Sequence, residues 1–120
     1  MARVLFVDDC AVARAVAERL FGEQGMPVTM AASSREAARV DPASFGAALL
    51  DLELADGLGT DLARLLRDGS PRLPIAFLTA AERAPLLDEA RALGPVFMKT
   101  SEVEEAIRWA TDAAKTPASR

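Results

Sequence analysis

The sequence RVLFVDD at residues 3–9 decides our view of the fold, because a short apolar run stops abruptly at two acidic residues. Three later runs share this form: each is apolar, and each ends at a polar residue that chemistry could use. They are AALL before Asp51, IAFL before Thr79 and VFM before Lys99. Short apolar runs of this kind are typical of parallel strands that are buried on both faces.

Segments with helical periodicity separate these runs. Gly25 suits the end of the first helix, since glycine often follows a helix C-terminus. Two capping boxes, one joining Ser33 to Glu36 and one joining Ser101 to Glu104, predict where two other helices begin. We predict helices over residues 11–24, from Ser33 to about 40, over 60–67, from Pro85 to Gly94 and from Ser101 to about 114, with a further strand over 28–31.

The resulting order alternates five strands with five helices. This pattern predicts an α/β fold of (βα)₅ type, a three-layer sandwich with helices on both faces of a parallel sheet. We favour the flavodoxin-like strand order 2-1-3-4-5. That order places Asp8 and Asp9 beside Asp51, at the rim outside the strand C-termini where ligands bind in such sheets.

Composition narrows the function classes. The chain has 120 residues, and we expect residues 1–115 to form one domain and residues 116–120 a flexible tail. A net charge of −4 argues against nucleic acid and anionic membranes as partners. There is no histidine, which excludes the usual zinc site and the usual general base. We expect no signal peptide, because a strand begins almost at once. The single cysteine leaves no internal disulfide and fits a reducing cytosol, so we expect a cytoplasmic protein.

The rim residues suggest phosphoryl chemistry on an aspartate. Carboxylates about 4 Å apart repel by roughly 4 kcal/mol at an effective dielectric near 20, so Asp8, Asp9 and Asp51 should attract a hard cation such as Mg²⁺, or Mn²⁺ in its place. An ionised aspartate can act as a nucleophile. Lys99 and Thr79 could then hold phosphoryl oxygens, since such reactions depend mainly on positioning and charge neutralisation.

These motifs together resemble the receiver domain of two-component response regulators, the CheY-like family. The resemblance extends from Met1 to about Ala114. It is carried by VDD at residues 7–9, Arg14, DLELADGLG at 51–59, Thr79-Ala80 and Lys99. It implies a signalling module that catalyses its own phosphorylation and dephosphorylation, and is not otherwise an enzyme.

The resemblance also implies roles for single residues. Asp51 would accept a phosphoryl group from a histidine kinase or a histidine phosphotransfer protein, and so gate contacts with an unknown downstream protein. The phosphoryl oxygens would be contacted by Thr79, Lys99 and the amide of Ala80.

The metal ligands implied by the resemblance come from the same rim. Asp9, Asp51 and the main-chain carbonyl of Glu53 would hold Mg²⁺ (or Mn²⁺). Asp8 would act mainly through water.

Four departures from the family pattern bear on how such a domain would work. The family usually has an aromatic residue where this chain has Val96, and we expect strand alternation to turn Phe97 to the other face. Thr100 replaces the usual proline, so a cis peptide is not expected there. Ala55 replaces a common proline. The segment between Thr79 and Lys99 is about two residues short, so the fourth helix should be trimmed or shifted.

Other residues have candidate roles beside ordinary structural ones. Glu53 and Ala81 occupy places that flank the phosphoryl group in receivers, and could tune the lifetime of a phosphoaspartate. Trp109 is either an edge of the core or an exposed anchor for a partner. The face of the first helix on which a phosphodonor would dock carries Arg14, Ala15 and Glu18.

The sequence leaves three functions open. The first is a phosphorylatable receiver, either standing alone or belonging to a larger regulator. The second is a non-phosphorylated interaction module on the same fold, which the loss of the switch aromatic keeps open. The third is a hydrolase of the haloacid-dehalogenase class, although that motif needs an aspartate where this chain has Glu53.

Overall fold

The computed structural model describes residues 2–116. The expected tail falls largely at residues 117–120, which lie outside the described residues, as does Met1. The strands are β1 (Val4–Val7), β2 (Val28–Ala31), β3 (Ala47–Leu50), β4 (Glu53–Leu54), β5 (Gly57–Leu58), β6 (Ile75–Thr79) and β7 (Val96–Met98). The helices are α1 (Ala11–Glu23), α2 (Ser34–Ala37), the 3₁₀ turn η1 (Pro42–Ser44), α3 (Gly59–Gly69), α4 (Ala84–Arg91) and α5 (Val103–Lys115).

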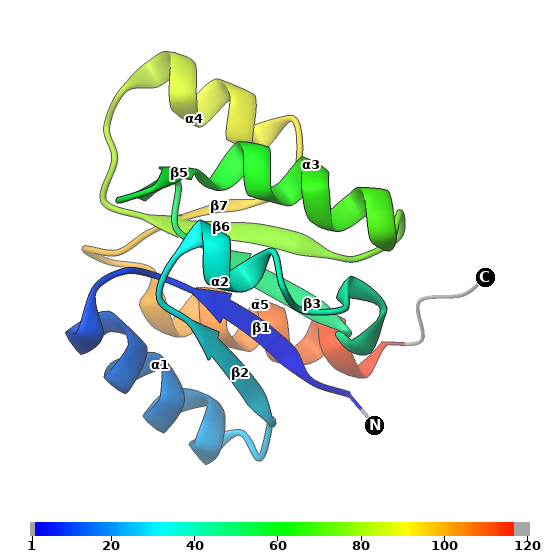
Figure 1. The fold of residues 1–120 in the computed structure, drawn as a ribbon. Helices are drawn as coiled ribbons and strands as arrows, with labels where there is room; N and C mark the ends of the chain where they lie inside the picture. Colours follow the sequence, from blue (N-terminus) through cyan, green and yellow to red (C-terminus); the bar gives the residue numbers. More distant parts are fainter. Residues whose placement is uncertain (1, 117–120) are drawn as a thin grey trace.

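Five of these strands form one parallel sheet, which confirms the predicted topology (Figure 1). The order is β2-β1-β3-β6-β7, so the first strand of the chain lies beside the third long one. Val7 pairs with Leu50 at the end of β1 and β3. The residues that follow these two strands therefore leave the sheet side by side.

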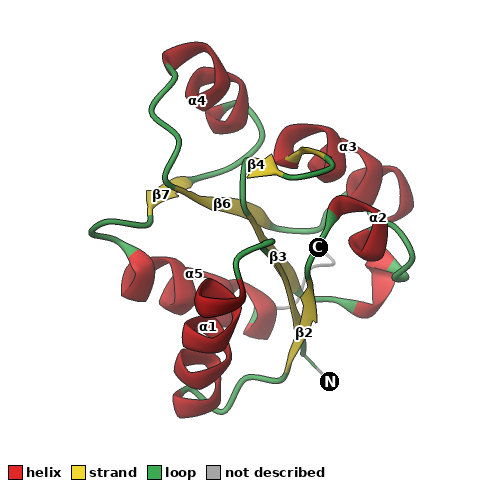
Figure 2. Cartoon of the chain, turned by 60° about the vertical axis from the view of Figure 1, so that its left-hand side comes forward, coloured by secondary structure: helices red, strands yellow, loops and turns green. Residues whose placement is uncertain are grey.

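Helices cover both faces of the sheet in three layers, as expected (Figure 2). Helices α1 and α5 lie on one face, while α2, α3 and α4 lie on the other. The strands supply both cores because successive side chains point to opposite faces. Leu5 and Val7 join the core beneath α3, whereas Val4 and Phe6 join the core beneath α5, and all four are buried.

Two glycines allow close approaches that other residues would block. A Cβ at Gly59 would overlap the main-chain carbonyl oxygen of Asp51, so α3 can start directly against the end of β3. A Cβ at Gly94 would likewise overlap the carbonyl oxygen of Ile75. Gly25, with φ of 67°, is in the left-handed region and follows the end of α1, as predicted.

The predicted N-cap at Ser33 is confirmed, but Glu36 reaches back to the residue before the cap, and the helix is shorter than predicted. The hydroxyl of Ser33 accepts the N–H of Glu36 at 3.0 Å, while the carboxylate of Glu36 accepts the N–H of Ala32 at 2.8 Å. Helix α2 then makes only one turn and stops at Ala37, before the predicted limit near 40. The residues after Ala37 lead to η1, which begins at Pro42, and proline cannot continue a helix.

The prediction of a second capping box, joining Ser101 to Glu104, is wrong. Helix α5 begins at Val103 and is preceded by Glu102, not Ser101. The reason is a tight turn, in which the carbonyl of Met98 accepts the N–H groups of both Ser101 and Glu102. The carboxylate of Glu102 accepts the N–H of Met98 at 2.9 Å and closes the turn from the other side.

An antiparallel hairpin between β3 and α3 was not predicted. Strands β4 and β5 have two residues each, too few for a period to be visible in the sequence.

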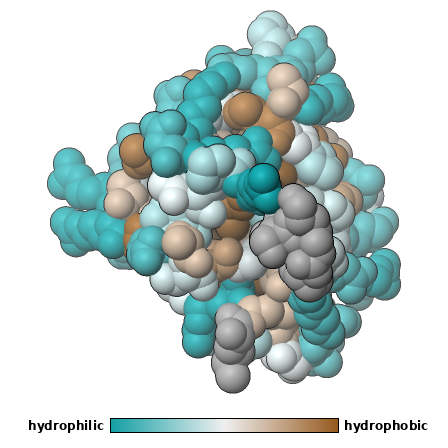
Figure 3. All heavy atoms as spheres, turned by 90° about the vertical axis from the view of Figure 1, so that its right-hand side faces the viewer, coloured by the Kyte–Doolittle hydropathy of each residue, from teal (hydrophilic) through white to brown (hydrophobic). Residues whose placement is uncertain are grey.

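Seen from the amino ends of the parallel strands, the surface is mainly polar, with hydrophobic colour in scattered spots (Figure 3). Among residues 2–116, no helix has the length and apolar character that crossing a bilayer requires.

Replacing Gly94 with alanine should lower the free energy of unfolding by about 1–3 kcal/mol, because the added methyl must displace the backbone of β6. Replacing Gly22 with alanine is the matched control, since nothing lies within 4 Å of a Cβ there. In helix α1 that change should stabilise the protein by about 0.5–1 kcal/mol. Urea denaturation measures both, and equal effects would contradict the close approach at Gly94.

Candidate functional site

Polar residues end or follow four of the parallel strands: Thr79 is the last residue of β6, and the others come directly after β1, β3 and β7. The N–H of Asp51 donates to the carbonyl of Val7 at 2.9 Å, and the N–H of Lys99 donates to the carbonyl of Thr79 at 2.9 Å. These bonds extend the sheet by one residue beyond the strand ends. The expected convergence of these side chains at one rim is therefore present.

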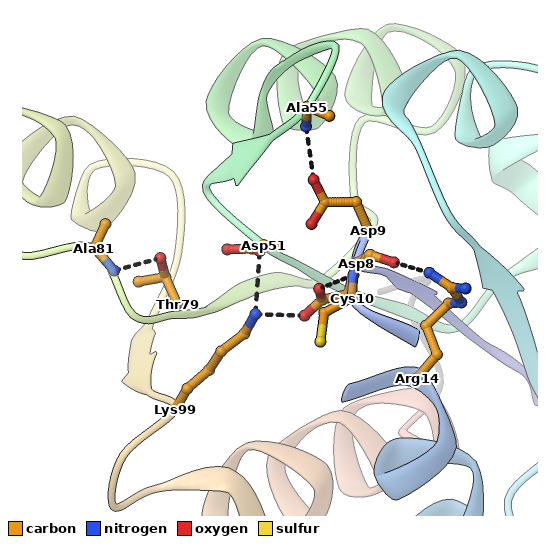
Figure 4. A network of polar contacts seen from close by, with 9 residues as sticks. All are labelled: Asp8, Asp9, Cys10, Arg14, Asp51, Ala55, Thr79, Ala81 and Lys99. Atoms are coloured by element: carbon orange, nitrogen blue, oxygen red, sulfur yellow. Dashed lines mark hydrogen bonds and ion pairs between the residues drawn. The ribbon is translucent and has the colours of Figure 1, made fainter. Parts of the chain in front are cut away.

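Three carboxylates meet at this rim (Figure 4). One oxygen from each of Asp8, Asp9 and Asp51 lies within 4.8 Å of the others. Asp8 and Asp51 are only 1% and 7% exposed, whereas Asp9 is exposed. The cluster therefore has two buried members and one that faces solvent.

Lys99 joins the two buried carboxylates. Its Nζ lies 2.6 Å from Oδ2 of Asp8 and 3.1 Å from Oδ2 of Asp51. One ammonium thus compensates two carboxylates, and the three groups together keep a net negative charge. The remaining negative charge would favour the binding of one more cation.

The loop that follows β1 fixes Asp8 in place. The N–H of Cys10 donates to Oδ1 of Asp8 at 2.9 Å, and the guanidinium of Arg14 donates to the main-chain carbonyl of Asp8 at 2.8 Å. Arg14 therefore lies at the edge of the site, with part of its side chain buried (Figure 4).

Burial and charge shift the protonation of this cluster. Burial raises the pKa of Asp51 above its ordinary value of 3.8; Lys99 opposes the rise and Asp8 adds to it. For Lys99, burial alone would lower the pKa, but the hydrogen bonds and charges of Asp8 and Asp51 outweigh it and raise the pKa above 10.5. Lys99 is therefore positively charged at neutral pH, whereas ionisation of Asp51 is less favourable in the folded protein than in water.

Thr79 lies on the side of Asp51 away from Asp8 and Asp9 (Figure 4). It is buried, and its hydroxyl oxygen accepts the N–H of Ala81 at 3.0 Å. Within residues 2–116 its hydroxyl hydrogen has no acceptor, so it can donate to another group. Ala80, between them in sequence, is exposed.

Glu53 and Arg83 form an ion pair that the sequence did not reveal. Their side chains meet at 2.8 Å and are about half or more exposed, at 47% and 69%. The pair links β4 to the loop between β6 and α4. No spacing signal could have predicted it, because 30 residues separate the two.

Comparison with known families gives this geometry a context. Residues 4–108 match the family model described as the response regulator receiver domain. The chain is a response regulator receiver domain. No curated protein matches it.

Solved structures resemble the receiver domain over nearly its whole length. A CheY-like receiver domain protein from Methanospirillum hungatei is 23% identical, with a TM-score of 0.81 and 96% and 97% of the two chains covered. TrrA of Thermotoga maritima, solved in complex with Mg²⁺ and BeF, is 22% identical, with a TM-score of 0.81 and 94% and 99% covered. A Burkholderia pseudomallei response regulator with a phosphorylated aspartic acid, a calcium ion and citrate is 25% identical, with a TM-score of 0.78 and 96% and 70% covered.

The donor set of the receiver domain fits a hard divalent cation. All three clustered side chains offer carboxylate oxygens, which Mg²⁺ and Mn²⁺ prefer, and no cysteine of the described residues belongs to the cluster. The exposure of Asp9 leaves a path from solvent, and the uncompensated negative charge supplies the attraction.

The departures at the fifth strand of the sheet are as expected. Val96 packs against the core on the α4 side and Phe97 against the core on the α5 side, so Phe97 does not substitute for the missing aromatic. Residues 2–116 contain no cis peptide, so the bond after Lys99 is trans. Helix α4 begins at Ala84, with Pro85 in its first turn.

The candidate partner surfaces of the receiver domain remain predictions. Ala15 and Glu18 are exposed on α1, whereas Arg14 is partly engaged with Asp8. Trp109 is half-buried and packs against the core beneath α5, as an edge residue of that core would. Its accessible part is still available to a partner.

Replacing Asp51 with asparagine should raise the free energy of unfolding at pH 7 without divalent cations by on the order of 1 kcal/mol, because it removes a buried charge whose desolvation Lys99 offsets only in part and to which Asp8 adds repulsion. Since burial raises the pKa of Asp51, its carboxyl stabilises the fold most fully below pH 3.8 and loses this contribution as pH rises through the folded pKa. The advantage of Asp51→Asn should therefore grow with pH over that interval and then level off.

Urea denaturation at several pH values measures this difference. Asp61→Asn removes the same charge from an exposed position in the first turn of α3, and should give no gain. An equal gain from both variants would mean that net charge alone, and not the cluster, governs the effect.

Proposed function

We propose that Asp51 is the phosphoacceptor of this receiver domain. The observation that carries the proposal is the placement of Lys99 between Asp8 and Asp51, in a carboxylate cluster at the rim of the sheet. Asp51 follows the central strand β3, and Figure 4 shows it between Thr79 and Lys99 on one side and Asp9 on the other. This is the position from which an attacking oxygen would be surrounded by groups that stabilise a phosphoryl group.

The donor would be a phosphohistidine on a histidine kinase or a histidine phosphotransfer protein. A carboxylate oxygen of Asp51 attacks phosphorus and forms a P–O bond, while the P–N bond breaks and its electron pair stays on the imidazole nitrogen. Lys99 offsets the charge on the transferred group, and the hydroxyl of Thr79 and the amide of Ala80 donate to its oxygens. Water later cleaves the phosphoaspartate, so the domain catalyses its own phosphorylation and dephosphorylation.

A divalent cation completes this site in the proposal. Asp8, Asp9, Asp51 and the main-chain carbonyl of Glu53 would hold Mg²⁺ or Mn²⁺, with Asp8 acting mainly through water. When bound, the cation neutralises the carboxylates and the phosphoryl oxygens. Its chain ligands come from the loops after β1 and β3, which the sheet register holds together.

The output of the domain would be a contact with a downstream protein, gated by the charge at Asp51. We propose residues 1–115 as the receiver unit, acting in the cytoplasm. Arg14, Ala15 and Glu18 would face the phosphodonor, and Trp109 would anchor a partner. Glu53 and Ala81 would tune the lifetime of the phosphoaspartate, Glu53 under the restraint of its ion pair with Arg83.

One observation favours a second candidate, an interaction module that works without phosphorylation. Val96 has no ring to rotate, and Phe97 packs on the opposite face of the sheet. The fold could then present a fixed surface. In that case the affinity for a partner would not respond to Mg²⁺ or to Asp51→Asn.

Incubation with Mg²⁺ and a small-molecule phosphodonor such as acetyl phosphate should add one phosphoryl group to the wild-type protein. Intact-mass spectrometry measures the adduct, which should be labile to hydroxylamine as an acyl phosphate is. Asp51→Asn should gain no mass, and omission of Mg²⁺ should slow the reaction strongly. Asp61→Asn is the matched control and should be phosphorylated like the wild type.

An unchanged wild-type mass would contradict the phosphoacceptor role and favour the silent module. An adduct that persists in Asp51→Asn would move the reaction to another residue. Repeated turnover of a phosphoester, without an accumulating adduct, would point instead to a hydrolase.

A further inference from the structure

Asp9 is the exposed member of the carboxylate cluster, and a contact outside the cluster holds it. Its Oδ2 accepts the N–H of Ala55 at 2.8 Å. Figure 4 shows the other oxygen of the same carboxylate turned toward Asp51. An exposed aspartate side chain would otherwise sample several rotamers, so this amide selects the orientation in which Asp9 faces the cluster.

The hairpin of β4 and β5 aims this amide. Glu53 pairs with Leu58 and Leu54 pairs with Gly57, which leaves Ala55 and Asp56 as the two residues of the turn. Leu54 is 7% exposed and packs into the core, so the hairpin is anchored from below. The N–H of Ala55 is outside the ladder and free to serve Asp9.

Asp56 holds the other side of the turn. Its Oδ1 accepts the N–H of Ser34 and its Oδ2 accepts the N–H of Arg35, each at 2.9 Å. These two bonds lower the pKa of Asp56. A Cβ at Gly57 would lie 3.8 Å from Cβ of Ser34, so the turn also packs against the start of α2. Two segments more than 20 residues apart are thus joined at the hairpin tip.

We propose that Ala55 and Asp56 are positioning residues for the cation site: Asp56 clamps the hairpin to α2, and the Ala55 amide orients Asp9 as a ligand. The inference rests on the cation site of the proposed function. Donors that orient metal ligands commonly alter metal affinity by about 10–100-fold when they are removed. The contact requires a residue with a main-chain N–H at position 55, which alanine has and proline lacks.

The first experiment removes the donor. Ala55→Pro deletes the N–H, and it suits the backbone because Leu54 before it is extended and no described residue other than glycine has positive φ. The dissociation constant for Mg²⁺, measured by calorimetry without any phosphodonor, should rise about tenfold. Ala55→Gly keeps the N–H and is the control, with a rise well below that of the proline variant.

The second experiment loosens the clamp and keeps the charge. Asp56→Glu retains the carboxylate and lengthens its arm, so the paired bonds to Ser34 and Arg35 cannot both keep their geometry. The dissociation constant for Mg²⁺ should rise about threefold, a smaller effect than loss of the donor itself. Asp41→Glu is the matched control, since Asp41 is also an exposed cap, accepting the N–H of Ala43 at 3.1 Å before β3, and should leave Mg²⁺ affinity unchanged.

A metal-free measurement separates this inference from the proposed function. Amide hydrogen exchange at Ala55 should speed up several-fold in Asp56→Glu and stay unchanged in Asp41→Glu. Absence of Mg²⁺ binding by the wild-type protein would overturn the cation site and, with it, any positioning role. Normal Mg²⁺ binding by the wild type and by both Ala55→Pro and Asp56→Glu would overturn the positioning role alone. If Ala55→Pro fails to fold, Asp56→Glu decides.

Discussion

The ion pairs of Lys99 are the interaction on which the rest of the site depends. Two carboxylates buried beside each other are unfavourable unless a positive charge accompanies them. Lys99 supplies that charge at 2.6 Å from Asp8 and 3.1 Å from Asp51. It can do so only because β7 lies next to β6 at the edge of the sheet, with its carboxyl end at the same rim as β1 and β3. Topology and electrostatics therefore impose the same arrangement.

Lys99 compensates the charge of the carboxylates only in part, and this imbalance bears on the function of the site. One ammonium and three carboxylates leave an excess of negative charge, which a bound cation or a proton can neutralise. The raised pKa of Asp51 expresses the same excess. A residue that carries negative charge reluctantly, beside a fixed ammonium and a reachable cation position, suits a role in which it is covalently modified and restored. Crowded carboxylates of this kind cost stability, which is common at functional sites.

Sequence reasoning recovered the sheet order and the convergence of Asp8, Asp9, Asp51 and Lys99, because both follow from apolar runs that end in polar residues and from the rules of parallel sheets. It misjudged the start of α5, since Ser101 and Glu104 form a plausible box locally while the turn at Met98 is closed by Glu102. It missed the hairpin and the contacts of Ala55, Asp56 and Arg83. The hairpin strands are too short to show a period, and the contacts join segments more than 20 residues apart, which no local period encodes.

The valine at position 96 has a consequence for how the domain could communicate. Valine is β-branched, so its χ1 rotation is restricted, and its side chain is small. Val96 therefore cannot move a bulky group in or out at the edge formed by α4 and β7. A partner able to tell two states apart would have to read displacement of the main chain itself, in the loop at residues 80–83 between β6 and α4. A partner that binds over the carboxyl ends of the strands would sense such a displacement better than one that binds beside α4 and β7.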